Sequence, residues 1–145
     1  MLKRCGFLII QYTNEQTEKF VLMQLRHDGR LGFIGGGIED GEEIEDGIIR
    51  EVLEEASYGK INKINMKKLK TSIFEDKEIH TYIYDASKEE IEYIMTSQIK
   101  AQHFLDESFG FILVPVTLYQ KWGVVDNFLK NIFSGTAKEE LNMLM

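Results

Sequence analysis

The sequence has a single cysteine, a single proline and no long hydrophobic run. With Cys5 alone, the chain can form no internal disulfide, which is typical of a reducing compartment. Its apolar run near the N-terminus, residues 6–10, is too short for a signal peptide and far too short to span a bilayer. From these absences we expect a cytoplasmic or nuclear protein with no membrane partner.

The chain also lacks internal repeats, low-complexity tracts and linkers rich in proline, glycine or serine. With 145 residues, of which 43% are hydrophobic, it is long enough to bury a full core without disulfides or a structural metal. We therefore expect one domain that spans residues 1–145.

Negative charge is concentrated in one short segment. Residues 39–55 contain nine acids and one base, a charge of −8, whereas the whole chain carries −7, so the other residues together carry +1. An anionic ligand could approach this segment only with cations between the two. The charge distribution also differs from that of a protein that binds nucleic acid through a broad basic face.

The pattern of side chains predicts a mixed α/β (α+β) fold. Runs rich in β-branched and aromatic residues predict strands at 5–12, 19–26, 31–34, 70–75, 79–85 and 109–114. We expect the third of these strands to end at the glycines 35–37, which do not favour regular structure. Strands in groups with helices between them indicate a mixed sheet between helical layers.

Helical spacing predicts helices at 44–56, from Ser87 to about residue 99, in part of 118–133, and from Thr136 onward. Ser87 with Glu90, and Thr136 with Glu139, have the spacing of capping boxes, which favour a helix start.

The helix expected at 44–56 gathers its acids on one side. At 100° per residue, Glu51, Glu54 and Glu55 fall within an arc of about 100°, and an apolar stripe is expected on a separate arc that faces the core. That stripe consists of Ile48, Ile49, Val52, Leu53 and Ala56. Like charges this close cost roughly 0.2–0.5 kcal/mol per pair even on an exposed helix, and a cation would remove the cost. Gly47, one turn before Glu51, would leave room for substrate.

Carboxylates without a nearby Cys/His cluster favour Mg²⁺ or Mn²⁺ over zinc. Mg²⁺ retains several waters and binds carboxylates together with substrate phosphates. The expected chemistry is therefore metal-assisted hydrolysis of a phosphate linkage.

The segment from Gly36 to Tyr58 resembles the Nudix box, Gx5Ex7REUxEExGU, in which U is an aliphatic residue. The matching positions are Gly36, Glu42, Arg50, Glu51, Val52, Glu54 and Glu55. The sequence departs from the box at Ser57, where the box has glycine, and at Tyr58, where it has an aliphatic residue. These departures affect the turn after the helix and leave every acidic position intact.

The resemblance implies roles for the matching residues. Glu51, Glu54 and Glu55 would be metal ligands, and one of them would also orient or deprotonate the water. Gly36 would offer its carbonyl to the metal. Arg50 would hold the loop by pairing with a carboxylate such as Glu42.

The flanks of the box, residues 23–33, 107–115 and 127–137, resemble the branch of Nudix hydrolases that decap small nucleolar RNA and hydrolyse (deoxy)inosine diphosphates. This branch implies hydrolysis of (deoxy)inosine di- or triphosphates to the monophosphate, or removal of an RNA 5′ cap. It also implies that Glu107 is a further metal ligand or water-activating carboxylate. Homodimers are common in such enzymes, so by analogy a homodimer is one expected assembly. The nucleotide would contact Arg26, His27, Phe33 (by stacking on the base), Gly35 and Gly36.

Each assignment has a structural alternative. The acidic helix face could be solvated surface, Phe33 a core residue, and Arg26 a surface residue of its strand. His80 fits a packed or surface histidine better than a ligand, and the lysines of 60–70 fit a solvated strand-and-turn face better than an RNA-binding patch. Three functions remain: a phosphohydrolase of inosine-type nucleotides, an RNA-decapping or RNA-binding protein, and a catalytically silent binding module.

Overall fold

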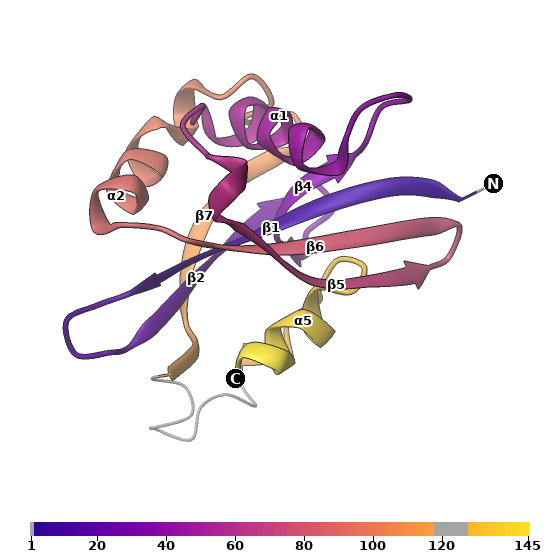
Figure 1. Cartoon of the computed structure of the whole chain (residues 1–145). Coiled ribbons are helices and arrows are strands. Elements are labelled where there is room, and N and C mark those ends of the chain that lie inside the picture. The colour runs from indigo at the N-terminus through magenta and orange to yellow at the C-terminus, as the bar shows by residue number, and fades with distance from the viewer. Residues whose placement is uncertain (1, 118–127) are drawn as a thin grey trace.

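The computed structural model describes residues 2–117 and 128–145 (Figure 1). The strands are β1 (Lys3–Thr13), β2 (Lys19–Arg26), β3 (Leu31–Gly32), β4 (Ile34–Gly37), β5 (Met66–Phe74), β6 (Lys77–Asp85) and β7 (Ser108–Pro115). The helices are α1 (Ile44–Ala56), α2 (Lys88–Ser97) and α5 (Ala137–Leu144), with short 3-10 helices η1 (Lys63–Asn65) and η2 (Gln98–Lys100). The bounds of α1 and β2 agree with the sequence prediction. Of the segment 118–133, which we expected to be partly helical, residues 118–127 lie outside the described residues.

The strands form one mixed sheet. Its main path is β3-β2-β1-β6-β5, with β7 paired to β2 and β4 paired to β1. β1 and β6 run parallel, whereas the other pairs are antiparallel. β1 pairs with β4 through residues 5–8 and with β2 through residues 11–13. This division of β1 places the glycines of β4 against its first half.

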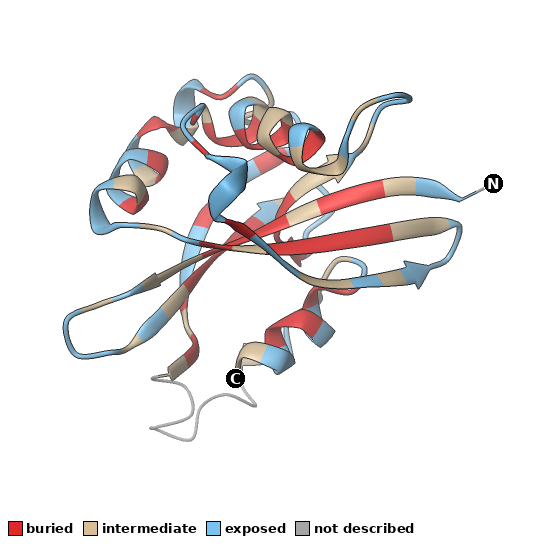
Figure 2. Ribbon diagram, viewed as in Figure 1, coloured by how far each residue is buried: buried red, intermediate tan, exposed pale blue. Residues whose placement is uncertain are grey.

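Helices cover both faces of the sheet, with α1 and α2 on one face and α5 on the other (Figure 1). Successive residues of β1 point to opposite faces, so Leu8 packs with Val52 of α1 and Ile9 packs with Leu141 of α5 in two separate apolar clusters. Figure 2 shows the buried residues concentrated where the helices meet the sheet. The expected mixed sheet between helical layers is confirmed. None of the described helices is long and apolar enough to cross a membrane.

The glycines that follow Phe33 do not end regular structure, which corrects the sequence prediction. The chain breaks at Phe33 and continues as β4 through Gly37. Gly35 has a φ of +148°, and a Cβ there would lie 2.1 Å from the carbonyl oxygen of Gly6. Glycine is therefore what allows β4 to approach β1 closely enough to pair.

The two departures from the Nudix box have a local structural role at the end of α1. Ser57 adopts the left-handed conformation (φ 56°) that a glycine would adopt without strain, and its N–H donates to the carbonyl of Leu53 at 3.0 Å. Tyr58 is buried, and its hydroxyl donates to Glu90 at 2.6 Å. Glu90 also completes the predicted capping box with Ser87. The turn after α1 is therefore anchored to the start of α2.

The second capping box was predicted wrongly. Thr136 precedes α5, but its side chain makes no capping bond and instead donates to Glu140 at 2.8 Å. The hydroxyl of Thr136 bonds the buried carboxyl of Glu140 in place of a backbone N–H of the helix. Glu139 lies at the surface, where it pairs with Lys70.

β5 starts at Met66, four residues before the predicted start, and includes Lys67, Lys68 and Lys70. These lysines therefore lie on a strand, as the structural alternative expected. His80 is buried and hydrogen-bonds Glu78 at 2.6 Å, which agrees with a packed histidine.

Candidate active site

The core-facing side of α1 carries acids as well as apolar residues. Ile48 and Val52 are fully buried, and Glu51 and Glu55 are buried beside them, with 9% and 5% exposed. Glu55 follows Ile48 by seven residues, which places it only about 20° away around the helix. Leu53, which we expected in the apolar stripe, is 52% exposed. The expectation of two separate arcs was wrong, because the acidic arc overlaps the buried one.

Glu55 is oriented by two donors. Its Oε2 accepts a hydrogen bond from Gln24 Nε2 at 3.2 Å and one from the backbone N–H of Gly35 at 3.4 Å. Burial, together with the neighbouring charge of Glu51, raises the pKa of Glu55 to about 8. The carboxyl of Glu55 is therefore fixed in place but costly to ionise in the absence of a cation.

Glu51 lies one helical turn from Glu55 and against β4. A Cβ at Gly36 would lie 2.9 Å from Glu51 Oε1, so the glycine leaves room for the carboxylate. Burial raises the pKa of Glu51 against the opposing charge of Arg50. Two buried acids with raised pKa values are costly to ionise alone, and a hard divalent cation would compensate the charge of these oxygen donors.

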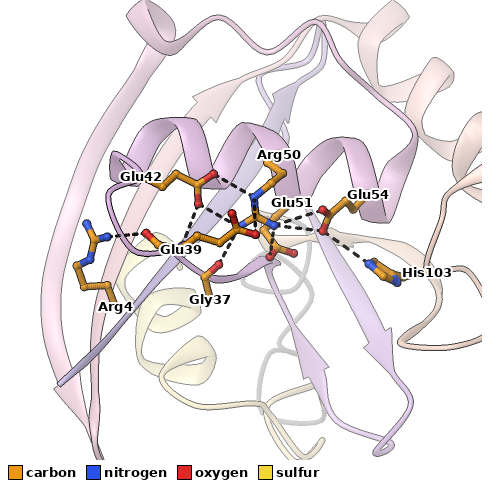
Figure 3. A network of polar contacts seen from close by, with 8 residues as sticks. All are labelled: Arg4, Gly37, Glu39, Glu42, Arg50, Glu51, Glu54 and His103. Carbon is orange, nitrogen blue, oxygen red and sulfur yellow. Dashed lines mark hydrogen bonds and ion pairs between the residues drawn. The ribbon is translucent and has the colours of Figure 1, made fainter. Parts of the chain in front are cut away.

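Arg50 joins the loop before α1 to the acids of the helix (Figure 3). Its Nε donates to Glu42 Oε2 at 3.0 Å and its Nη2 donates to Glu42 Oε1 at 3.1 Å, a bidentate pair. Nη2 also donates to the carbonyl of Gly37 at 3.0 Å, and Nη1 donates to Glu51 at 3.2 Å. Hydrogen bonding between the two side chains raises the pKa of Arg50 and lowers the pKa of Glu42. The pairing of Arg50 with a carboxylate such as Glu42, which the resemblance implied, is present.

Glu54 lies between Arg50 and a histidine. Arg50 Nη1 is 3.3 Å from both carboxylate oxygens of Glu54, and His103 Nε2 is 3.6 Å from Glu54 Oε2 (Figure 3). Within residues 2–117 and 128–145, no three acidic, histidine or cysteine side chains already form a metal-binding group. In this arrangement the guanidinium of Arg50 contacts the carboxylates of Glu51 and Glu54. The roles of these two glutamates as metal ligands stay predictions.

Gly47 does not leave room for substrate. A Cβ at this position would lie 2.5 Å from Ile38 Cδ1 and 2.8 Å from Glu42 Oε1. The space beside Gly47 is therefore filled by the loop that precedes α1. The glycine permits close packing of that loop, and the sequence interpretation of this residue was wrong.

Most of the predicted site residues meet at a pocket of about 350 Å³. Glu51 and Glu55 line it from α1, and Glu107 lines it from the residue just before β7. Arg50, Glu54 and Phe33 are not among its lining residues. The other lining residues are Gln24, Arg26, His27, Gly35, Gly36 and Gly37.

A second pocket, of about 250 Å³, adjoins the first, because Arg26 and the glycines 35–37 line both. It reaches α5 and includes Phe33 and Glu140. Phe33 is only 4% exposed and packs in the core on the α5 side, which favours the core alternative over base stacking. Arg26, which lines both pockets, pairs with Asp28 at 3.3 Å.

Three polar residues of this region were missed in the sequence. Gln24 is buried among the apolar residues of β2. A polar side chain inside an apolar strand indicates a specific hydrogen-bond partner, and this signal is present in the sequence. Glu140 is 2% exposed, and its Oε1 accepts hydrogen bonds from Thr81 and Thr136 at 2.7 and 2.8 Å. His103 gives no sequence signal, since it lies in a loop that only the fold brings to α1.

The raised pKa of Glu55 gives a pH dependence that can be tested. The ordinary pKa of Glu55 is 4.5, and its pKa in the folded protein is about 8. Between these two pH values Glu55 is protonated in the folded protein and ionised in the unfolded chain. The stabilisation from this proton is complete below about pH 4.5 and is lost as the pH rises through 8.

We therefore expect the free energy of unfolding of the metal-free protein to fall from pH 5 to pH 8, by up to about 1.4 kcal/mol per pH unit for one proton. Urea unfolding in the presence of a chelator measures this slope. Glu55→Gln should flatten the dependence. A wild-type stability that rises over the same range would contradict the buried, protonated acid.

The chain is similar in sequence to a known protein family and to several of its characterised relatives. The family model described as "Nudt16-like: U8 snoRNA-decapping enzyme-like" matches residues 8–145. The U8 snoRNA-decapping enzyme of Ovis aries is 33% identical over 128 residues, covering 83% of this chain and 65% of that protein. The Tudor-interacting repair regulator protein of Gallus gallus is 32% identical over 126 residues, covering 83% of this chain and 40% of that protein. The chain thus spans less than two thirds of the length of these relatives.

The fold comparison agrees with the sequence comparison. The crystal structure of a mutT/nudix family protein from Listeria innocua superposes with a TM-score of 0.63 at 15% identity, covering 98% of this chain and 88% of that one. This similarity establishes the fold. Since the family model spans nearly the whole sequence and the relatives exceed 30% identity, the chain belongs to the Nudt16-like family of Nudix hydrolases.

Proposed function

We propose that the chain is a metal-dependent pyrophosphohydrolase that cleaves the diphosphate linkage of a nucleotide. The observation that carries the proposal is the buried pair Glu51 and Glu55, which line one pocket together with Glu107. Burying two acids side by side costs free energy unless a cation compensates their charge, and core packing alone gives no reason for it. A site that recruits a cation and a diphosphate gives that reason.

The residues proposed to hold Mg²⁺ or Mn²⁺ are Glu51, Glu54, Glu55, Glu107 and the carbonyl of Gly36. Nudix hydrolases generally use divalent metal ions. A bound ion would offset the charge of the diphosphate and lower the pKa of a water molecule. The oxygen donors favour these ions over zinc.

The protein's own residues orient the reacting groups and provide a carboxylate that accepts a proton from water. The water oxygen forms a bond to phosphorus, the bridging P–O bond breaks, and the leaving phosphate keeps the electron pair. One carboxylate accepts the water proton, and the candidates are Glu55, which Gln24 and Gly35 orient, and Glu107 across the pocket. Arg50 holds the loop before α1 against the helix, which keeps these groups in position.

The nucleoside half of the substrate is proposed to extend into the second pocket. Arg26 and the glycines 35–37 line both pockets, so a nucleotide can pass from one to the other. His27 would contact it from the rim of the first pocket. At the far side, the carboxyl of Glu140 offers a hydrogen-bonding group to a polar base edge.

The proposed substrates are (deoxy)inosine di- and triphosphates, hydrolysed to the monophosphate, or capped RNA. The relatives named U8 snoRNA-decapping enzyme support capped RNA. A silent binding module stays the alternative, since the name of another relative, the Tudor-interacting repair regulator protein, describes an interaction and no enzyme activity. Binding of RNA through the lysines of β5 has less support, since Lys70 already pairs with Glu139 and Lys68 contacts His80.

A substrate panel tests the proposal. We expect inosine diphosphate to be converted to the monophosphate in Mg²⁺ or Mn²⁺, with turnover lost on addition of a chelator. Capped RNA at the same concentration, with product identification, decides between a nucleotide phosphohydrolase and a decapping enzyme. Complete inactivity on both substrates and on a broad nucleotide panel would favour the silent module and contradict the proposed reaction.

A further inference from the structure

The loop of residues 101–107 carries Glu107 and is organised around His103. The carbonyl of His103 accepts hydrogen bonds from the backbone N–H groups of Asp106, Glu107 and Ser108 at 3.2, 3.0 and 3.2 Å. The position of the backbone at Glu107 is therefore tied directly to that of His103. The carbonyl of Glu107 also accepts a bond from the N–H of His27 at 3.1 Å, which fixes the other side of the loop to the residue that follows β2.

His103 also binds α1, at Glu54 (Figure 3). Its backbone N–H donates to the carbonyl of Glu54 at 3.3 Å. This carbonyl belongs to the last turn of α1, where carbonyls lack a partner within the helix. Its imidazole Nε2 lies 3.6 Å from Glu54 Oε2, on the carboxylate that Arg50 contacts as well. One residue thus touches Glu54 through both its main chain and its side chain.

From these contacts we propose that His103 is a positioning residue, which holds the Glu107 loop against the end of α1, the helix that carries Glu51 and Glu55 into the pocket. The inference rests on the proposed function, because it assigns Glu107 and the acids of α1 to one cation site. Glu51 and Glu55 come from the helix and Glu107 from a loop about fifty positions later in the sequence, and the contacts of His103 join these two elements. Groups that orient metal ligands typically contribute about 10- to 100-fold to metal affinity.

The test measures Mn²⁺ binding by electron paramagnetic resonance, independently of turnover, in the wild type and in variants of the loop. We expect His103→Ala to weaken Mn²⁺ binding by about 10-fold or more. Most of kcat should return at saturating Mn²⁺. His103→Gln, which keeps a polar group beside Glu54, should bind Mn²⁺ about as tightly as the wild type. Gln102→Ala, an exposed neighbour in the same loop, is the matched control and should bind Mn²⁺ like the wild type.

Wild-type affinity in His103→Ala would overturn the positioning role, and so would an equal loss in Gln102→Ala, since that would indicate a general effect on the loop. If His103→Ala does not fold, a large loss in a folded His103→Gln overturns it. A wild-type protein that binds no Mn²⁺ would overturn the proposed function itself and the positioning role with it, a result distinct from a change confined to the variants.

Discussion

Replacing Glu55 with glutamine is expected to lower kcat by about 10²–10⁴-fold, the range associated with loss of a positioned proton-transfer group. Glutamine keeps the size of the side chain and an oxygen that can accept the bonds from Gln24 and Gly35. It removes the negative charge that the proposed site needs to hold a cation. The effect should therefore appear in turnover and in Mn²⁺ affinity, with little change in structure.

The stability of the same variant separates a chemical effect from a folding defect. Because burial makes Glu55 costly to ionise, Glu55→Gln should unfold at an equal or higher temperature than the wild type at pH 8 in a chelator. Glu92→Gln, at an exposed position of α2, is the matched control and should leave kcat unchanged. Near-wild-type turnover in Glu55→Gln would show that the metal site has been assigned to the wrong residues.

Replacing Arg50 with alanine is expected to reduce the free energy of unfolding by about 1.5–3 kcal/mol, the range for hydrogen bonds that involve charged groups, because the network is partly buried. Arg50 bonds Glu42, Glu51, Glu54 and the carbonyl of Gly37, so its loss leaves three carboxylates without their shared cation. Arg50→Lys should recover only part of the loss, because an ammonium group cannot form the bidentate pair with Glu42.

Urea unfolding in a chelator measures this loss, and repeating it with Mn²⁺ tests its cause. If repulsion among the acids accounts for the instability, Mn²⁺ should stabilise Arg50→Ala by more than it stabilises the wild type. Lys63→Ala removes an exposed ion pair with Asp46 and should leave the free energy of unfolding close to that of the wild type. An Arg50→Ala protein as stable as the wild type would contradict a structural role for the network.

Patterns of residues close together in the sequence predict much of the fold and part of the site. The bounds of α1 follow from its periodicity, and the capping box of α2 follows from the spacing of Ser87 and Glu90. The pairing of Arg50 with Glu42 was accessible because both lie in one motif of fixed spacing. These features depend on neighbours in sequence, which a single sequence displays.

Features that depend on distant segments were not accessible in the same way. The pairing of the glycines with β1 requires knowledge of where Gly6 lies, and the burial of Phe33 depends on α5. The contact of His103 with Glu54 joins residues far apart in the chain. The burial of Glu55 was partly accessible, since its helical angle places it beside Ile48. The sequence interpretation placed the acids on a separate face of the helix and therefore missed that Glu55 lies beside the core.

The most direct test of the central claim is a crystal structure with Mn²⁺ and a non-hydrolysable nucleotide, with anomalous scattering recorded at the manganese edge. We expect an anomalous peak within ligand distance of Glu51 and Glu55, next to the backbone of Gly36, with the diphosphate bound to the same ion. A nucleotide bound elsewhere, or these glutamates turned apart with no manganese between them, would contradict it.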